Sequence, residues 1–246
     1  MKKTLLLTLV TAALAVSSQA QLTNNYAGNG NATFGGAVGN GSLQLVNDSS
    51  GALNFTYTRG SSSFNNAIVL YIDSIAGGAA STAGFTDNAD GLRIAMSGFR
   101  GGAERSTLNF SGGFGADYAI ALNNGFAAVW SLSNPTNFPY ITSGNISPNT
   151  QTNGTYNFSF NVTDLGLTAN SGQSFDFFST YISETAWRSS ETFGATFSTP
   201  SQQGYLTFDA AASNTFTTVP EPTTYALLTL GALGVAGYAA RRRARK

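Results

Sequence analysis

The sequence contains no cysteine and no histidine among its 246 residues. Without cysteine, the chain cannot form disulfides, a thiol nucleophile or a thiolate-ligated zinc or iron–sulfur site. Without histidine, it cannot build a Ser-His-Asp triad or a histidine-ligated haem or metal cluster. These absences exclude several common enzyme classes, and they favour a protein that is not an enzyme.

Charged residues are also scarce, at 10% of the chain, whereas hydrophobic residues make up 42% and aromatic residues 12%. This apolar content is sufficient for a folded core. Most basic residues lie at the two ends, so the stretch between residues 22 and 218 contains five basic and eleven acidic residues and carries a net charge of −6. An acidic body argues against nucleic acid as a partner, because nucleic-acid binding needs basic patches.

The first 20 residues (1–20) have the pattern of a secretory signal peptide. Two lysines precede an apolar run over residues 5–16, and Ser18 and Ala20 are small residues before the expected cut. The apolar run is short for a membrane span. We therefore expect the Sec machinery to export the chain and signal peptidase to cleave it between Ala20 and Gln21.

The C-terminal residues 219–246 have three parts in order. A stretch with two prolines, which block regular structure, comes first and consists of Val219, Pro220, Glu221 and Pro222. Residues 223–240 are uncharged, and as a helix they would rise about 27 Å, which suffices for a transmembrane helix. A basic tail at 241–246 follows, and it includes Arg241, Arg242 and Arg243. By the positive-inside rule the tail stays cytoplasmic and the preceding chain lies outside.

This arrangement resembles the PEP-CTERM sorting signal of Gram-negative bacteria. In that family an exosortase, a membrane protease or transpeptidase, recognises the tail and cuts near Pro-Glu-Pro, and members are associated with exopolysaccharide and biofilm. The resemblance implies an exosortase-like partner and processing near residues 219–222. It also implies a chain anchored in the membrane before processing, and at the cell surface or outside the cell afterwards. A plain membrane anchor is the alternative.

Between the two ends lies the body, residues 21–218, in which short segments alternate apolar and polar residues. Leu43 and Leu45 alternate with polar neighbours, as do Leu53, Phe55 and Tyr57, and the turn-forming residues from Asn47 to Gly51 separate them. This pattern predicts a β-hairpin. The continuous apolar run at 67–72 predicts a central strand.

Further strands are expected at 91–96, 106–110, 116–122, 126–132, 155–163, 173–182, 192–198 and 204–209. No segment of the body has clear helical periodicity. The body is therefore predicted to be all-β, with a single jelly-roll-like β-sandwich over residues 21–209. A Ser/Thr/Ala-rich linker at 210–218 follows, and this linker and the Gly/Asn-rich residues 22–40 are predicted to be the most flexible parts.

Residues 69–132 carry a second, weaker resemblance. They contain LYIDS (70–74), GFTDNADGLRIAMSGF (84–99) and FGADYAIAL (114–122). This order is similar to the β-sandwich modules of the DOMON and family-9 carbohydrate-binding group. The resemblance implies a sandwich with a sugar-binding role, whereas the haem role of some members is not supported in a chain without histidine.

One loop offers oxygen ligands of the kind that calcium prefers. Asp87, Asn88 and Asp90 lie close together in the sequence, and Asp73 ends a predicted strand nearby. The spacing does not match an EF-hand. A solvated turn whose side chains bond their own backbone is the alternative. Calcium is the one cofactor that the sequence suggests.

Sugar binding would need exposed aromatic platforms, and carbohydrate hydrolysis would need paired carboxylates. Trp187 and Tyr140 are the candidate platforms, whereas Trp130 lies in an apolar strand and is expected in the core. A glycosidase needs two carboxylates across a sugar bond, and the glutamates of the body are Glu104, Glu184 and Glu191. No local pattern selects a pair, and Glu184 is expected to form a surface ion pair with Arg188.

These observations predict an exported protein of the cell surface or extracellular matrix, sorted through its tail and without enzymatic activity. It would contact polysaccharide or neighbouring envelope material. A carbohydrate-binding module with a defined sugar site is the first alternative. A histidine-free glycoside hydrolase or lyase is the second.

Overall fold

The computed structural model describes residues 21–147, 154–220, 231, 233 and 234. This part of the chain is mostly β-structure with one short α-helix, α2 (Gly91–Ser97). The predicted signal peptide at 1–20 lies outside the described residues, as does the predicted transmembrane segment 223–240 apart from three of its residues. Among the residues that are described, no helix has the length and apolar character needed to cross a membrane.

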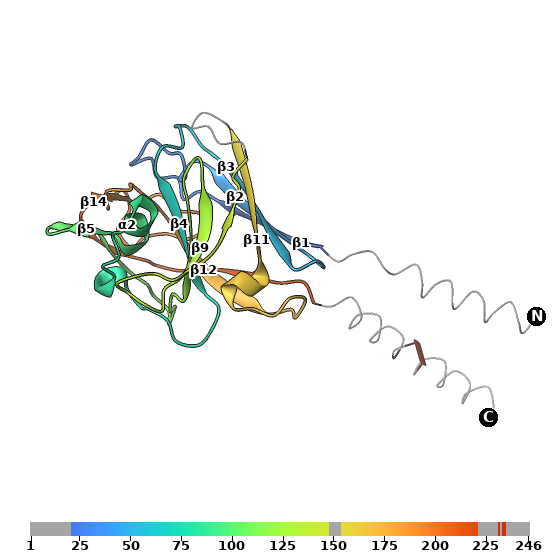
Figure 1. The fold of residues 1–246 in the computed structure, drawn as a ribbon. Helices are drawn as coiled ribbons and strands as arrows, with labels where there is room; N and C mark the ends of the chain where they lie inside the picture. The colour runs from blue at the N-terminus through green and yellow to red at the C-terminus, as the bar shows by residue number, and fades with distance from the viewer. Residues whose placement is uncertain (1–20, 148–153, 221–230, 232, 235–246) are drawn as a thin grey trace, which may run out of the picture.

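The strands form two main antiparallel sheets (Figure 1). The smaller sheet has the order β1-β2-β3-β11, with the bounds Gln21–Ala27, Ser42–Asp48, Ala52–Thr58 and Thr155–Asn161. The larger sheet has the order β10-β9-β8-β4-β12-β13-β14, with the bounds Tyr140–Gly144, Ala127–Ser131, Tyr118–Leu122, Ala67–Asp73, Ser174–Ile182, Arg188–Ser189 and Gln203–Gly204. Strand β16 (Asn214–Thr217) also pairs with β12.

The remaining elements are short. They are the strand pairs β5 (Phe99–Gly101) with β6 (Glu104–Arg105) and β7 (Thr107–Asn109) with β15 (Thr207–Asp209), and the 3-10 helices η1 (Thr82–Gly84) and η2 (Val162–Leu165). The pair formed by β7 and β15 is parallel.

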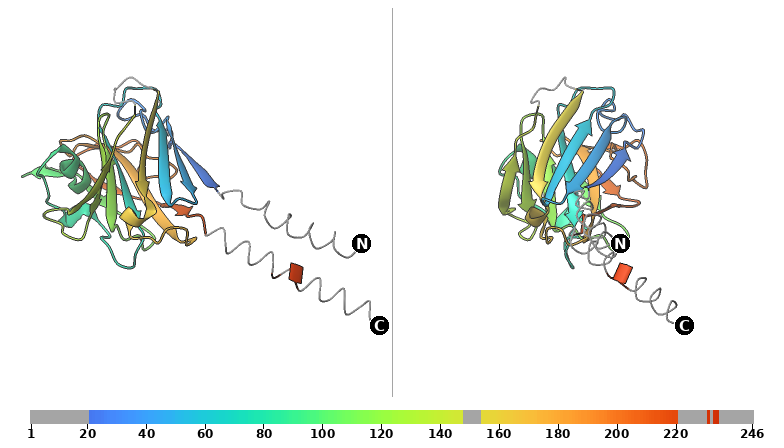
Figure 2. Two further views of the ribbon diagram at one scale, coloured as in Figure 1. Left: turned by 45° about the vertical axis from the view of Figure 1, so that its right-hand side comes forward. Right: turned by 90° about the vertical axis from the view of Figure 1, so that its right-hand side faces the viewer.

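Apolar side chains cover both faces of the larger sheet. One hydrophobic cluster combines residues of both main sheets, such as Leu45 and Phe55 from the smaller and Ile120 from the larger. A second cluster lies on the opposite face of the larger sheet and includes Leu92 and Met96 of α2. The larger sheet accordingly lies between the smaller sheet and α2 (Figures 1 and 2).

Strand β4 contributes to both clusters. Its alternate side chains divide between them, with Ile68, Leu70 and Ile72 in the first and Ala67, Val69 and Tyr71 in the second. A strand buried on both faces must be apolar at every position, which explains the continuous apolar run. Since β8 and β12 flank β4 on its two edges, the prediction of a central strand is confirmed.

The predicted hairpin is also confirmed. Leu45 of β2 lies opposite Phe55 of β3, and both side chains are buried. The turn contains Gly51 at φ +83°, a conformation that favours glycine. Six other predicted strand segments contain β7, β8, β9, β11, β12 and β15.

The segment 91–96, predicted as a strand, is the helix α2, and the expectation of a body without helices is therefore wrong. The Asp90 side chain caps the helix by accepting a backbone N–H of its first turn at 2.9 Å. Gly98 ends the helix in the left-handed conformation. Only three of its apolar residues are buried at helical spacing, too few for a clear periodic pattern, and they are Leu92, Ala95 and Met96.

Three further expectations need correction. Residues 192–198 do not form a strand and make only isolated bridges, at Phe193 and Phe197. The predicted linker 210–218 contains β16, whose Phe216 is fully buried. The predicted flexible stretch 22–40 contains most of β1. Polar residues outnumber apolar ones in both β1 and β16, so their composition did not indicate strands.

A buried carboxylate holds the loop that follows β1. Glu191 is fully buried, and its two oxygens accept four backbone N–H groups at 2.6–3.1 Å, from Phe34, Gly36, Val38 and Gly39. These donors replace the water that a buried carboxylate loses. A Gly/Asn-rich stretch that its composition predicts to be flexible is thereby ordered.

Arg188 is a second buried charge. Its guanidinium donates to Thr180 Oγ1 at 2.9 Å and to Ser106 Oγ at 3.3 Å. Among the described residues it forms no ion pair. Glu184 instead accepts a hydrogen bond from Asn123 at 2.8 Å. The predicted surface pair between Glu184 and Arg188 is therefore wrong, because strand β13 carries Arg188 into the interior.

We predict that Glu191→Ala lowers the free energy of unfolding by about 3–5 kcal/mol, because several buried N–H groups lose their acceptor. Glu191→Gln should cost less, since one side-chain oxygen remains. Urea unfolding followed by tryptophan fluorescence measures both changes. Glu184→Gln is the control and should stay within about 1 kcal/mol of the native protein. A loss below about 1 kcal/mol for Glu191→Ala would contradict the role of this carboxylate.

Candidate functional site at the end of the body

The last strand of the body docks the chain onto the larger sheet. Phe216 of β16 lies opposite Phe175 of β12, and the two buried rings have centroids 5.6 Å apart. The residues that lead into the C-terminal tail are therefore part of the folded body.

The two residues that follow β16, Thr218 and Val219, are also buried, with 1% and 2% of their surface exposed. The Thr218 N–H and hydroxyl both donate to the carbonyl oxygen of Gln173, at 2.8 and 2.9 Å. The Val219 N–H donates to Oδ1 of Asn47 at 2.7 Å. We call these four residues, Asn47, Gln173, Thr218 and Val219, the clamp.

Asn47 is held in position by a second hydrogen bond. Its side chain is 1% exposed, and Nδ2 donates to the carbonyl oxygen of Ala52 at 2.8 Å. This bond orients the amide so that Oδ1 faces Val219. The sequence suggested only a turn residue at this position, because the partner lies 172 residues later in the chain.

The two ends of the body meet beside the clamp. A shallow cavity of about 510 Å³ is lined by Gln21 and Leu22 of β1 together with Thr217, Val219 and Pro220. Pro220 forms an isolated bridge with Ser171. The expected new N-terminus therefore lies next to the start of the C-terminal tail.

Among the residues predicted for processing, the structure describes Gln21, Val219 and Pro220. The others lie outside the described residues: Ala20, Glu221, Pro222, Arg241, Arg242 and Arg243. Gln21, the residue that follows the expected signal-peptide cut, belongs to β1.

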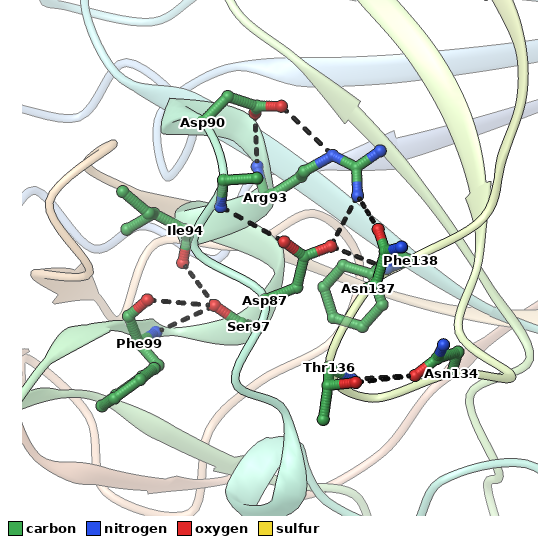
Figure 3. A network of polar contacts seen from close by, with 11 residues as sticks. Asp87, Asp90, Arg93, Ile94, Ser97, Phe99, Asn134, Thr136, Asn137 and Phe138 are labelled. Atoms are coloured by element: carbon green, nitrogen blue, oxygen red, sulfur yellow. Dashed lines mark hydrogen bonds and ion pairs between the residues drawn. The ribbon is translucent and has the colours of Figure 1, made fainter.

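The carboxylate of Asp87, one of the predicted calcium ligands, has other partners (Figure 3). Its Oδ2 accepts from Arg93 Nη1 and from the Phe138 N–H, both at 2.6 Å. Asp90 caps α2 and contacts Arg93 at 3.2 Å. Asn88 donates its side-chain amide to the backbone. This network ties α2 to the segment after β9.

Asp73 has different neighbours from this network. Its Oδ2 accepts the N–H of Gly115 at 2.9 Å. Burial raises the pKa of Asp73 above its ordinary value, and the charges of Asp117 and Asp176 raise it further, whereas the Gly115 N–H lowers it. Asp73 and Asp176 line a shallow hollow of about 340 Å³ that the sequence did not indicate. In the part of the chain that is described, no three acidic side chains are placed to hold a metal ion.

The predicted sugar platforms lie on different elements. Trp187 is 40% exposed, and its ring meets Tyr205 edge-on at 4.9 Å. Tyr140, on β10, is 52% exposed and meets the buried Trp130 edge-on at 6.1 Å. Both platforms are open to solvent.

Comparison with known families identifies one feature of the chain. Residues 218–243 match the PEP-CTERM protein-sorting motif. No curated protein and no solved structure matches the chain, and the resemblance of residues 69–132 to DOMON and carbohydrate-binding modules has no support. A PEP-CTERM motif implies an exported protein that an exosortase processes and sorts to the cell surface.

The match begins at Thr218, within the clamp. The motif and the folded body therefore share residues 218–220. Strand β16, the clamp and Pro220 together form the docked end of the body, and this docked end is the candidate functional site.

We predict that Asn47→Ala loosens the docked end, because the buried Val219 N–H loses its acceptor at a cost of about 1–3 kcal/mol. Amide hydrogen exchange over 214–219, measured by mass spectrometry, should become faster, while exchange in β4 stays unchanged. Asn25→Ala removes an exposed amide of β1 and is the matched control. Unchanged exchange over 214–219 in Asn47→Ala would show that this bond does not hold the segment.

Proposed function

We propose that this is a non-enzymatic protein of the cell surface or extracellular matrix, whose body contacts exopolysaccharide and takes part in biofilm. The observation that carries this proposal is the outward face of the smaller sheet. Its inward side chains belong to the first hydrophobic cluster, and the alternate positions point the other way.

This outward face is polar and almost without charge. Among the four strands β1, β2, β3 and β11, Asp48 is the only charged residue. The amides and hydroxyls form rows across the strands, and the central row consists of Asn25, Gln44, Thr56 and Asn157. The sheet faces the viewer in the right-hand view of Figure 2.

Hydrogen bonds order this central row. Gln44 donates to Asn25 at 2.8 Å, and Thr56 donates to Asn157 at 2.9 Å. A hollow of about 280 Å³ lies over β3 and β11 and is lined in part by Asn145. Ordered amides and hydroxyls supply both donors and acceptors, which is the chemistry that a polyhydroxylated chain can match.

The charge distribution favours a neutral partner. The body carries a net charge of −6, yet this face carries almost none of it. A face without cations does not attract acidic polymers. Its amides and hydroxyls can pair with the hydroxyls of a neutral polymer without the cost of desolvating a charge. We therefore propose neutral polysaccharide, or neutral segments of it, as the partner.

The glutamates of the body support a role without catalysis. Glu191 is fully buried, Glu104 pairs with Arg100 at 3.2 Å, and Glu184 accepts from Asn123. A glycosidase requires two carboxylates that reach one substrate, and a fully buried Glu191 cannot be one of them. This arrangement disfavours a hydrolase that uses the glutamates of the body.

A module with a defined sugar site is the second candidate, and one observation favours it. Trp187 is exposed beside Tyr205, whose hydroxyl donates to the Thr185 carbonyl oxygen at 3.2 Å. Leu206, which is 48% exposed, lies near Trp187, because the side chains of both residues flank Gly204. An aromatic pair with a polar edge can accept the apolar face of one sugar ring.

We predict that Thr56→Asp together with Asn157→Asp weakens binding to the organism's own exopolysaccharide by roughly tenfold, because each new charge must be desolvated without a partner. Co-sedimentation with purified polysaccharide measures the change. Thr199→Asp adds one charge at an exposed position outside the sheet and should bind like the native protein.

The same assay separates the two candidates. Trp187→Ala should have little effect if the sheet face binds the polymer, and Phe126→Ala, which removes a similarly exposed aromatic ring, is its control. Loss of binding in Trp187→Ala alone would favour the defined sugar site. Release of oligosaccharides from the polymer would instead favour an enzyme.

We predict that Glu221→Ala impairs sorting, because it alters the Pro-Glu-Pro sequence and leaves the apolar segment and the basic tail intact. Cell fractionation and intact-mass analysis should reveal unprocessed protein in the membrane fraction. The conservative change Arg243→Lys keeps the tail's charge and is the control. If native and Glu221→Ala chains both end at Lys246 with the same location, the tail is only an anchor.

A further inference from the structure

We infer that the processing enzyme cuts the chain at a bond beyond Pro220, outside the clamp. This inference rests on the proposed sorting and specifies where in the 219–222 region the bond is broken. While the body is folded, the bonds on either side of Val219 are not available to a membrane protease or transpeptidase.

The first reason is the state of the backbone. Enzymes that cut peptide chains bind them in an extended form, by pairing with backbone N–H and C=O groups. The N–H groups of Thr218 and Val219 already donate to Gln173 and Asn47, at 2.8 and 2.7 Å. They are therefore not free to pair with an enzyme.

The second reason is the burial of side chains on this segment. Val219 is 2% exposed, and Phe216, three residues earlier, is fully buried in the first cluster. An enzyme that needed several residues before a cut at Val219 would have to withdraw both side chains from the body. Segments with this much buried apolar surface open rarely.

Pro220 marks the end of the protected segment. It is only partly buried, and it packs against Gly172, where an added Cβ would lie 3.3 Å from the proline ring. Gly172 also has φ +68°, which disfavours other residues. Proline has no N–H to satisfy, so no backbone donor is left unpaired where the clamp ends.

A cut after Pro220 leaves the clamp intact in the mature protein. Strand β16 then stays paired with β12, and the new carboxyl end leaves the body beside Gln21, across the shared cavity. A cut before Val219 would remove one side of the clamp and expose the amide of Asn47.

Mass analysis of the protein recovered from the native cell surface tests this inference. The intact mass and the C-terminal peptide should include Val219 and Pro220 and should lack the end of the tail. A mature chain that ends at Val219 or earlier would overturn the inference and leave the proposed sorting standing. A chain that still ends at Lys246 would overturn the proposed sorting, and the inference with it.

Limited proteolysis tests the clamp without the native enzyme. The exported chain ending at Lys246, purified in detergent, is treated with a protease of broad specificity. Native protein should be cut after Pro220 first, and cutting within 214–219 should be at least about tenfold faster in Asn47→Ala. Asn25→Ala, which removes an exposed amide of β1, is the surface control. Early cuts within 214–219 of the native chain, or equal rates in Asn47→Ala, would overturn the protection that we assign to the clamp.

Discussion

The structure depends on covering strand β4, which is apolar on both faces. A strand of this kind cannot lie at a surface, so the larger sheet needs a layer on each side. The smaller sheet supplies one layer through residues such as Phe55 and Phe158. The helix α2 and the short strands β7 and β15 supply the other. The short helix thus helps to bury the second face of β4, through Leu92, Ala95 and Met96.

Two charged residues, Glu191 and Arg188, are fully buried. Neither Glu191 nor Arg188 forms an ion pair with another described residue. Glu191 is satisfied by backbone N–H groups, and Arg188 donates to hydroxyl oxygens. Burying a charge in this way avoids a second buried charge, but it makes the fold depend on an exact arrangement of neutral donors and acceptors. The loop at 34–39 is ordered for this reason.

The docked end of the body belongs both to the folded domain and to the sorting motif. The PEP-CTERM motif begins at Thr218. In the clamp, Thr218 bonds to Gln173, the residue before β12, and Val219 bonds to Asn47 of the first hairpin. The processing motif is therefore attached directly to a folded domain and not through a free linker. Folding of the body limits which bonds the enzyme can reach, and the same contacts keep β16 in the mature protein. The two described ends of the body lie together at one cavity.

The sequence alone determined the β-rich character of the body, its central strand and its first hairpin. These features depend on local patterns: alternation in Leu45 and Phe55, the glycine turn at Gly51, and the unbroken apolar run of β4. The sequence also determined the sorting motif, whose three parts are contiguous in the chain. Helix α2, with seven residues, is too short to produce a clear helical periodicity, and strand β16 has a single apolar residue, Phe216, so neither was predicted. The tertiary structure decided the rest, since the clamp joins Asn47 to Val219 and the buried carboxylate joins Glu191 to residues 34–39. A hydrogen bond between residues more than 150 positions apart cannot be recognised from a local sequence pattern. Only the packing of the two sheets brings those residues together.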